Sequence, residues 1–197
     1  AQLQACADRG IRLAVSLDGG PQGHNAVRCL PGGQGTYEAV VRTITRALGC
    51  GMPVSVSITL AAQTLLDAEI AVAFAMDHDL PFNLNFVRVD AGGTGIVPHV
   101  DALTQALRRC LHAVESRLDA YAHPLTGILD RVHFDVPHAH TCAAGRDYLA
   151  IDTQGRTAPC QMLLDHPWGS MTEAAPLDAL RAKGASRFGV PVDDRPD

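Results

Sequence analysis

Residues 11–18 of the chain, IRLAVSLD, alternate between large apolar side chains and small or polar ones, as a half-buried β-strand does. One face of this predicted strand carries Ile11, Leu13, Val15 and Leu17. Gly19-Gly20-Pro21 then ends the strand. After a glycine-rich loop, Thr36 is the predicted N-cap of a helix whose apolar stripe is Val40, Val41, Ile44 and Leu48. The segment therefore predicts a strand followed by a covering helix.

The same order of elements follows twice more along the chain. Residues 54–60 alternate in the same way, and a helix is predicted from about Thr64 to Met76. A third strand is predicted over Phe82 to Val89, and a long amphipathic helix follows, with an apolar stripe of Leu103, Leu107, Leu111, Val114 and Leu118. Repeated strand–helix units predict an α/β fold with a parallel sheet and right-handed crossovers.

The second face of each predicted strand is polar rather than apolar. Its side chains are Ser16 and Asp18, Ser57 and Thr59, and Asn83 and Asn85. A parallel sheet buried on both faces would be apolar throughout, so polar residues near the carboxyl ends of the strands indicate a barrel interior or crevice that holds a polar ligand. Because three strands cannot close a barrel, we expect the chain, which begins with Ala, to be an excerpt of a longer protein.

Composition narrows the classes of function. With 47% apolar residues, 197 residues can bury a core and suit one domain with a small appendage. A net charge of −5 without a basic run argues against nucleic acid as the main partner. No apolar stretch approaches the roughly 20 residues of a membrane span, and no export signal is present, so a cytoplasmic location without membrane contact is expected.

Two of the six cysteines enclose a predicted β-hairpin. Residues 148–151 and 156–158 flank the turn Asp152-Thr153-Gln154-Gly155, so Cys142 and Cys160 lie at its two roots. Two thiolates brought together in this way suit a metal ion or an iron–sulfur cluster, and the remaining ligands must come from elsewhere. The other cysteines, Cys6, Cys29, Cys50 and Cys110, are interpreted as small buried hydrophobic residues.

Several smaller motifs leave alternatives open. The glycine runs 32–35 and 92–95 are interpreted as turns rather than as phosphate loops, and His138, His140 and Cys142 are a weaker candidate for zinc. His24 and Arg28 follow the first strand at a spacing of four. The guanidinium suits a carboxylate at the mouth of a polar crevice, and an ordinary surface charge is an equal alternative. No nucleophile-elbow sequence supports hydrolase chemistry.

Two segments of the chain resemble radical S-adenosylmethionine enzymes of the SPASM subgroup. Residues 16–28, SLDGGPQGHNAVR, are similar to that family's fourth strand, in which a Ser-x-Asp-Gly strand end precedes His-(Asp/Asn)-x-x-Arg. The later Cys142-x12-Gly155-x4-Cys160 is similar to the opening of the SPASM cluster-binding extension. The resemblance implies that residues 1–136 are the second half of a partial (β/α)6 TIM-like barrel. It also implies that residues 137–197 begin the hairpin-and-helix extension.

The resemblance also implies site residues and cofactors. Ser16 and Arg28 would hold the amino-acid end of S-adenosylmethionine, with Arg28 on the carboxylate, and Leu84 would lie beside the adenine, mainly through its backbone. Asp18, Thr59 and Asn85 would line the same funnel less directly, and Cys142 and Cys160 would bind an auxiliary 4Fe–4S cluster. The radical-generating 4Fe–4S cluster would be bound by a CxxxCxxC motif that lies outside this chain, so the fragment alone is expected to be inactive.

The function implied is hydrogen abstraction from a peptide or protein substrate by a 5′-deoxyadenosyl radical, with electrons from a donor such as flavodoxin or ferredoxin. Oxidation, crosslinking and epimerisation all remain open. Gln161 stands where sulfatase-maturating members have an Asp, which makes that reaction less favoured. The alternative is a non-catalytic barrel relative that docks a peptide. An ordinary aldolase-like barrel would not explain the cysteine hairpin.

Overall fold

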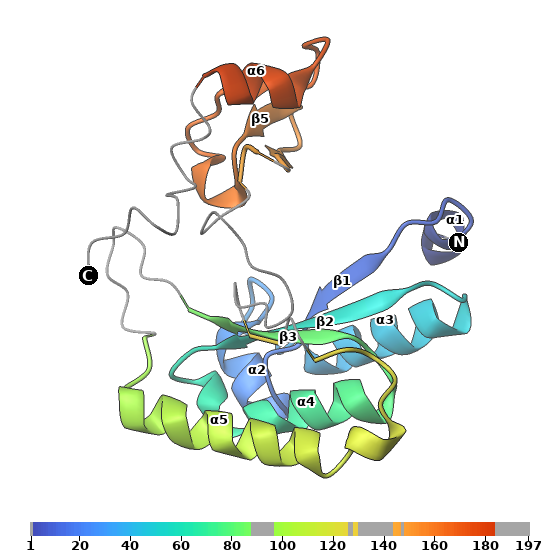
Figure 1. Ribbon diagram of the computed structural model, residues 1–197, viewed down its shortest axis with the longest axis vertical. Helices are drawn as coiled ribbons and strands as arrows, with labels where there is room; N and C mark the ends of the chain where they lie inside the picture. Colours follow the sequence, from blue (N-terminus) through green and yellow to red (C-terminus); the bar gives the residue numbers. More distant parts are fainter. Residues whose placement is uncertain (1, 88–96, 126–127, 130–143, 147, 184–197) are drawn as a thin grey trace. The chain divides into compact units, whose positions relative to one another are not determined.

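The chain divides into two compact units, residues 1–132 and 133–197, and each is described by itself. The structure is a computed structural model that describes residues 2–87, 97–125, 128–129, 144–146 and 148–183 (Figure 1). Across these residues, no helix has both the length and the apolar character that a membrane span requires.

The first unit is built on a three-stranded parallel sheet in the order β1-β2-β3. Its strands are β1 (Leu13–Ser16), β2 (Val54–Leu60) and β3 (Phe82–Phe86). Helices α2 (Pro21–Val27) and α3 (Tyr37–Gly49) connect β1 to β2. A short 3-10 helix, η1 (Thr64–Leu66), and α4 (Ala68–Asp77) connect β2 to β3, and α5 (Val100–Glu115) follows β3. The predicted parallel sheet with helical crossovers is therefore confirmed.

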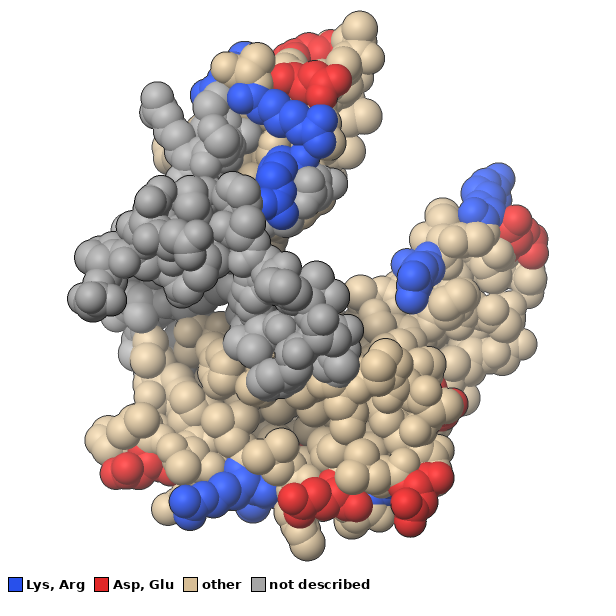
Figure 2. Space-filling view, viewed as in Figure 1, with Lys and Arg blue, Asp and Glu red and all other residues tan. Residues whose placement is uncertain are grey.

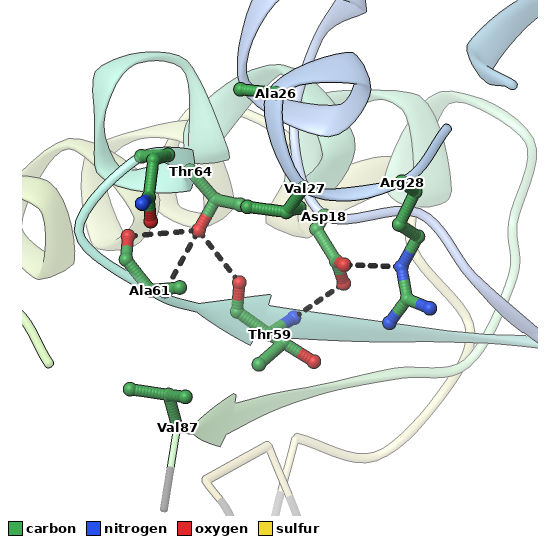
Figure 3. Close-up of a pocket in the computed structure, with 9 residues that line it drawn as sticks. Asp18, Ala26, Val27, Arg28, Thr59, Ala61, Thr64 and Val87 are labelled. Atoms are coloured by element: carbon green, nitrogen blue, oxygen red, sulfur yellow. Dashed lines mark hydrogen bonds and ion pairs between the residues drawn. The ribbon is translucent and has the colours of Figure 1, made fainter. Parts of the chain in front are cut away.

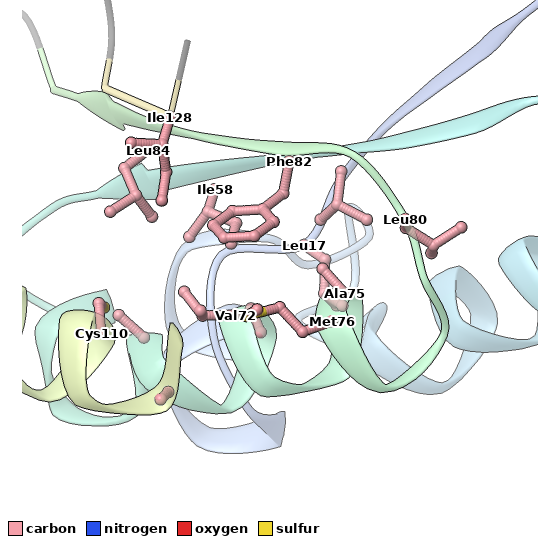
Figure 4. Packing of buried hydrophobic residues seen from close by; sticks show 14 of the residues in the cluster. Leu17, Ile58, Val72, Ala75, Met76, Leu80, Phe82, Leu84, Cys110 and Ile128 are labelled. Carbon is pink, nitrogen blue, oxygen red and sulfur yellow. The ribbon is translucent and has the colours of Figure 1, made fainter. Parts of the chain in front are cut away.

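Helices α2 to α5 all lie on one face of the sheet (Figure 1). The side chains of β2 are buried at every second position, and the buried ones are Val54, Val56, Ile58 and Leu60. Together with Phe82 and Leu84 of β3 they pack against α4 and α5, where Val72, Met76 and Cys110 complete the same core (Figure 4). The remaining side chains of β2 are half-buried on the other face, so the predicted apolar and polar faces are both present.

The ends of the first unit are short elements. Helix α1 (Gln2–Ala7) precedes β1, and the 3-10 helix η2 (Leu118–Ala120) follows α5. Beyond η2, Ile128 and Leu129 lie beside β3, where the Leu84 N–H donates to the Ile128 carbonyl at 2.6 Å and Leu84 forms a parallel bridge with Leu129. The sequence analysis did not identify this extended segment next to β3.

Three local predictions were wrong in part. The helix predicted from Thr64 to Met76 is interrupted at Asp67, whose backbone is not helical. Thr36 is the N-cap residue of α3, as predicted, but its side chain makes no capping hydrogen bond. The Asn25 carboxamide oxygen accepts the hydrogen bond from the Tyr37 N–H at 2.9 Å instead. Leu111 and Leu118 are about half exposed, and α5 buries Ala106, Cys110, Ala113 and Val114.

The interpretation of the isolated cysteines was only partly right. Cys110 is buried in the core, whereas Cys6 and Cys50 are half-buried and Cys29 is exposed. Burial raises the pKa of the Cys110 thiol to about 12, so this side chain stays a neutral thiol. The glycine run 32–35 forms a turn, as expected, in which the Leu30 N–H donates to the Gln34 carbonyl at 2.8 Å. The run 92–95 lies outside the described residues.

The second unit contains the predicted hairpin. Strands β4 (Ala150–Ile151) and β5 (Arg156–Ala158) are antiparallel, and β6 (Gly169–Ser170) pairs with β5. The Asp152 carboxylate holds the turn by accepting hydrogen bonds from the N–H groups of Gln154 and Arg156, both at 2.9 Å. Desolvation alone would raise the pKa of Asp152. These hydrogen bonds and the Arg156 side chain outweigh that effect, so the pKa of Asp152 is lowered. Helices η3 (Gln161–Leu163) and α6 (Pro176–Ala182) complete the unit.

Charged side chains of both signs alternate along the edge of the first unit that Figure 2 shows at the bottom. Arg109 of α5 pairs with Glu69 of α4 at 3.2 Å, and Arg117 pairs with Asp77 at 2.7 Å. The first pair connects α4 to α5, and the second connects the end of α4 to Arg117, which follows α5. Neither sign of charge therefore dominates this edge.

Ile58→Ala should lower the free energy of unfolding by about 2–5 kcal/mol, because it removes a fully buried side chain and leaves a cavity between the sheet and α4. Leu111→Ala is the matched control and should change it by no more than about 0.5 kcal/mol, since Leu111 is 49% exposed. Urea denaturation of both variants measures the difference. Equal losses would contradict this assignment of the core.

Candidate functional site

A pocket of about 420 Å³ lies at the carboxyl ends of the three parallel strands (Figure 3). Its wall is formed by residues that follow β1, by the end of β2 with the turn after it, and by the residue after β3. The lining side chains are Asp18, Ala26, Val27, Arg28, Thr59, Ala61, Gln63, Thr64 and Val87. This is the edge at which open parallel sheets bind their ligands, and the volume is suited to a small molecule.

Asp18 organises the pocket wall. It is 1% exposed, and its two carboxylate oxygens have different partners. Oδ1 accepts a hydrogen bond from the Thr59 N–H at 2.8 Å, and Oδ2 accepts one from Nε of Arg28 at 2.5 Å. The sequence analysis placed Asp18 in the funnel but ranked it below Ser16 and Arg28. The structure shows it joining the end of β1 to β2 and to the residue that ends α2.

Arg28 is held at one edge of its guanidinium group and is accessible at the other. Its side chain is 40% exposed, and Nε is occupied by Asp18. Figure 3 shows the two terminal nitrogens directed away from Asp18. Because a guanidinium binds carboxylate or phosphate through a pair of parallel N–H groups, the edge formed by these nitrogens can bind an anionic group of a ligand.

His24 is structural rather than part of the pocket lining. It is fully buried, its Nδ1 accepts a hydrogen bond from the Asp18 N–H at 3.2 Å, and its Nε2 lies 3.1 Å from Oγ1 of Thr36. Thr36 in turn donates to the Arg28 carbonyl at 2.9 Å. Burial lowers the pKa of His24, while the charge of Asp18 opposes this shift. A neutral imidazole therefore connects the backbones of Asp18 and Arg28.

Two residues that the sequence analysis did not identify hold the loops behind the pocket. The Thr64 hydroxyl donates to the Thr59 carbonyl at 2.7 Å and accepts from the Ala61 N–H at 2.8 Å, which closes the turn after β2. Oδ2 of Asp67 accepts a hydrogen bond from the Gly23 N–H at 3.0 Å. The signal that could have indicated this contact is the spacing of Gly19, Gly20 and Gly23, because a Cβ at any of them would overlap Asp67.

The other predicted site residues lie on two different faces of the sheet. Ser16, Thr59 and Asn85 are on the polar face, where Asn85 donates to Oγ of Ser57 at 2.8 Å and accepts from Asn83 at 2.8 Å. Of these, Thr59 lines the pocket. The Leu84 side chain is 1% exposed and lies in the core beneath the sheet. Its N–H is already bonded to the Ile128 carbonyl, so the predicted backbone contact with adenine would have to be made by the Leu84 carbonyl.

The predicted cluster ligands are only partly described. Cys160 is half-buried two residues after the end of β5, and its backbone carbonyl accepts a hydrogen bond from the Leu163 N–H at 3.0 Å. Cys142, His138 and His140 lie outside the described residues. In the part of the chain that the structure describes, no three His, Cys, Asp or Glu side chains converge as metal ligands.

No sequence-family profile matches the chain, and no curated protein sequence matches it. Several solved structures match the chain in fold. "Native anSMEcpe with bound AdoMet" is 14% identical with a TM-score of 0.67 over 95% of this chain and 54% of its own. "Native anSMEcpe with bound AdoMet and Cp18Cys peptide" is 14% identical with a TM-score of 0.62, over 95% and 55%. "Native anSMEcpe with bound AdoMet and Kp18Cys peptide" is 14% identical with a TM-score of 0.63, over 94% and 54%.

The chain therefore shares the fold of a radical S-adenosylmethionine enzyme, since anSME is an anaerobic sulfatase-maturating enzyme of that type. This confirms the predicted resemblance at the level of the fold. The chain spans about half the length of the solved structures it matches.

Gly23→Ala should lower the free energy of unfolding by about 1–3 kcal/mol, because the added methyl group would overlap Oδ1 of Asp67 and press on the backbone of Thr64. Gly49→Ala is the control, since a methyl group there meets no other atom within 4 Å and alanine favours the helix. Thermal or urea unfolding measures both. If Gly23→Ala is as stable as Gly49→Ala, the close packing of Asp67 on this turn is wrong.

Acidification should destabilise the protein in part through His24. Its pKa in the folded state lies below the ordinary value of 6.5, so below that pH the unfolded state binds more protons. The His24 contribution is therefore intact above about pH 6.5 and is lost as the pH falls through the lowered folded pKa.

In His24→Asn, whose oxygen can still accept from the Asp18 N–H, the free energy of unfolding should depend less steeply on pH between 7 and about 5. The exposed His112→Gln is the control and should follow the wild type. Identical curves for all three proteins would disprove the assignment.

Proposed function

We propose that this chain forms the S-adenosylmethionine-binding half of a radical enzyme that modifies a peptide or protein. The observation that carries the proposal is the guanidinium of Arg28, held by Asp18 at the edge of a pocket where parallel strands end. The likeness in fold to structures titled with bound AdoMet and with bound peptide supports the same cofactor and the same class of substrate.

The pocket has a cationic group at one edge and apolar side chains along part of its wall. Ala26, Val27, Ala61 and Val87 supply apolar wall, and the two terminal nitrogens of Arg28 would bind the carboxylate of S-adenosylmethionine. Ser16, at the end of β1, would contribute to the amino-acid end of the ligand, and Thr59 and Asn85 would line the polar face beyond it.

In this proposal Asp18, His24 and Arg28 bind and orient the ligand. Asp18 fixes the direction of the Arg28 side chain, and neutral His24 fixes the backbone between them. S-adenosylmethionine, given one electron by a reduced 4Fe–4S cluster, would supply the radical that abstracts hydrogen from an unreactive C–H bond of the substrate. We place the radical-generating 4Fe–4S cluster on a part of the protein outside these 197 residues.

In the same proposal, residues 1–136 form the second half of a partial (β/α)6 barrel, and residues 137–197 form the start of a cluster-binding extension. Cys142 and Cys160 would bind an auxiliary 4Fe–4S cluster together with cysteines from elsewhere. An electron donor such as flavodoxin or ferredoxin would be a partner. Gln161, which follows Cys160, lacks the carboxylate of the sulfatase-maturating reaction, so another peptide modification is favoured.

Arg28→Ala should weaken S-adenosylmethionine binding by roughly 1.5–3 kcal/mol, the scale of a lost charge-assisted hydrogen bond. Equilibrium dialysis with labelled S-adenosylmethionine measures the change. Arg42→Ala is the control, because Arg42 is exposed on α3 away from the pocket and its loss should leave the affinity unchanged. An unchanged dissociation constant in Arg28→Ala would rule out the proposed role.

The double variant Cys142→Ala/Cys160→Ala should lose about four irons per protein while S-adenosylmethionine cleavage persists, because one 4Fe–4S cluster would lose two of its thiolates. Anaerobic iron and sulfide analysis with EPR, on the protein as its gene encodes it, tests this. Cys29→Ala, at an exposed cysteine, is the matched control and should retain all iron. Full iron content in the double variant would exclude these two cysteines as ligands.

A further inference from the structure

Asp67 is a buried carboxylate with no part in the proposed pocket lining. It lies between η1 and α4 and is 8% exposed. Its backbone carbonyl accepts a hydrogen bond from the Gly20 N–H at 3.2 Å, and its Oδ2 accepts one from the Gly23 N–H at 3.0 Å. Among the described residues, Oδ1 has no hydrogen-bond partner. A buried carboxylate oxygen without a partner costs free energy of folding, which indicates that Asp67 has a role that offsets this cost.

The turn that follows β1 is shaped around this carboxylate. Gly19, Gly20 and Gly23 each place their Cα so close to Asp67 that an added Cβ would collide with it. Backbone N–H groups at the beginning of a helix favour negative charge, and in other proteins such glycine turns bind anions from solution. Here the chain's own Asp67 occupies that place, which anchors the first turn of α2 to the start of α4.

Helix α2 connects the turn held by Asp67 to the pocket. The helix has seven residues, from Pro21 to Val27, and Arg28 follows directly as its C-cap. Its rise of about 1.5 Å per residue puts Arg28 within roughly 10 Å of the anchored turn. The loop that carries Asp67 follows β2, the strand whose Thr59 N–H donates to Asp18. Asp67, α2, Arg28 and Asp18 therefore form a closed ring of contacts behind the pocket.

We infer that Asp67 is a positioning residue that sets the direction of the Arg28 guanidinium through α2. Without the carboxylate, the Gly23 N–H loses its acceptor, while the Gly20 N–H still bonds to the Asp67 carbonyl. The start of α2 is then held less firmly, and the Arg28 Nε–H no longer stays aligned with Asp18. The effect of Asp67 on S-adenosylmethionine rests on the proposed function, whereas its effect on Arg28 does not.

The direct test is the Nε–H signal of Arg28 in a ¹⁵N NMR spectrum, assigned by its loss in Arg28→Lys. In the wild type this proton is hydrogen-bonded to Asp18. Asp67→Ala removes the acceptor of the Gly23 N–H and should shift the signal and speed its exchange with water. Asp77→Ala, at an exposed position at the end of α4, should leave it unchanged. A role confined to global stability would not move this signal in the folded protein. An unchanged signal in folded Asp67→Ala overturns the inference.

Should Asp67→Ala fail to fold, Asp67→Ser is the milder replacement, because its shorter side chain moves the oxygen away from the Gly23 N–H and keeps a polar group, and the same Arg28 signal is measured. A double-mutant cycle gives the functional consequence. Asp67→Ala should weaken S-adenosylmethionine binding about tenfold in the wild type and hardly at all in Arg28→Ala. Equal losses in both backgrounds would show that Asp67 does not act through Arg28. If the wild type binds no S-adenosylmethionine, the proposed function falls, and the Arg28 signal still decides the role of Asp67.

Discussion

The Asp18 carboxylate is the interaction on which the arrangement of the first unit's pocket depends. It is almost completely buried at the end of β1, and it contacts the neighbouring strand through the Thr59 N–H and the end of α2 through Arg28. A buried carboxylate must be paired and hydrogen-bonded to be tolerated, and here both oxygens are satisfied. The Arg28 guanidinium is thereby held with one edge toward Asp18 and the other available to a ligand. Since the ion pair is buried on the Asp18 side only, its main effect is on geometry.

The sheet that carries this pocket separates two kinds of surface. Beneath it, side chains at alternate positions pack with α4 and α5 into an apolar core (Figure 4). On the other face, Ser57, Asn83 and Asn85 are linked in a hydrogen-bonded chain of neutral side chains. A core on one face and uncharged hydrogen-bonding groups on the other are expected when a sheet wraps around a polar ligand. Asp18 and Arg28 add charge where β1 and α2 end.

The period-two pattern of residues 54–60 predicted both faces of β2, because alternation reports directly which side chains share a face. The turn around Asp152 and Gly155 predicted the β4–β5 hairpin for a similarly local reason. Asp67 could not be predicted in this way, since its bond to Gly23 crosses 44 positions and interrupts a segment with good helical pattern. The Asn25 cap of α3 and the segment beside β3 likewise depend on tertiary contacts. Arg28 was identified from its motif, but the partner that orients it was revealed only by the structure.

The central claim is that Arg28, fixed by Asp18, binds the carboxylate of S-adenosylmethionine. The most direct test compares the affinity of this chain for S-adenosylmethionine with its affinity for the decarboxylated analogue, which differs only in lacking that group. Our account predicts that the analogue binds at least about tenfold more weakly, since it cannot form the charge-assisted pair. Equal affinities, or no binding of either molecule, would contradict it.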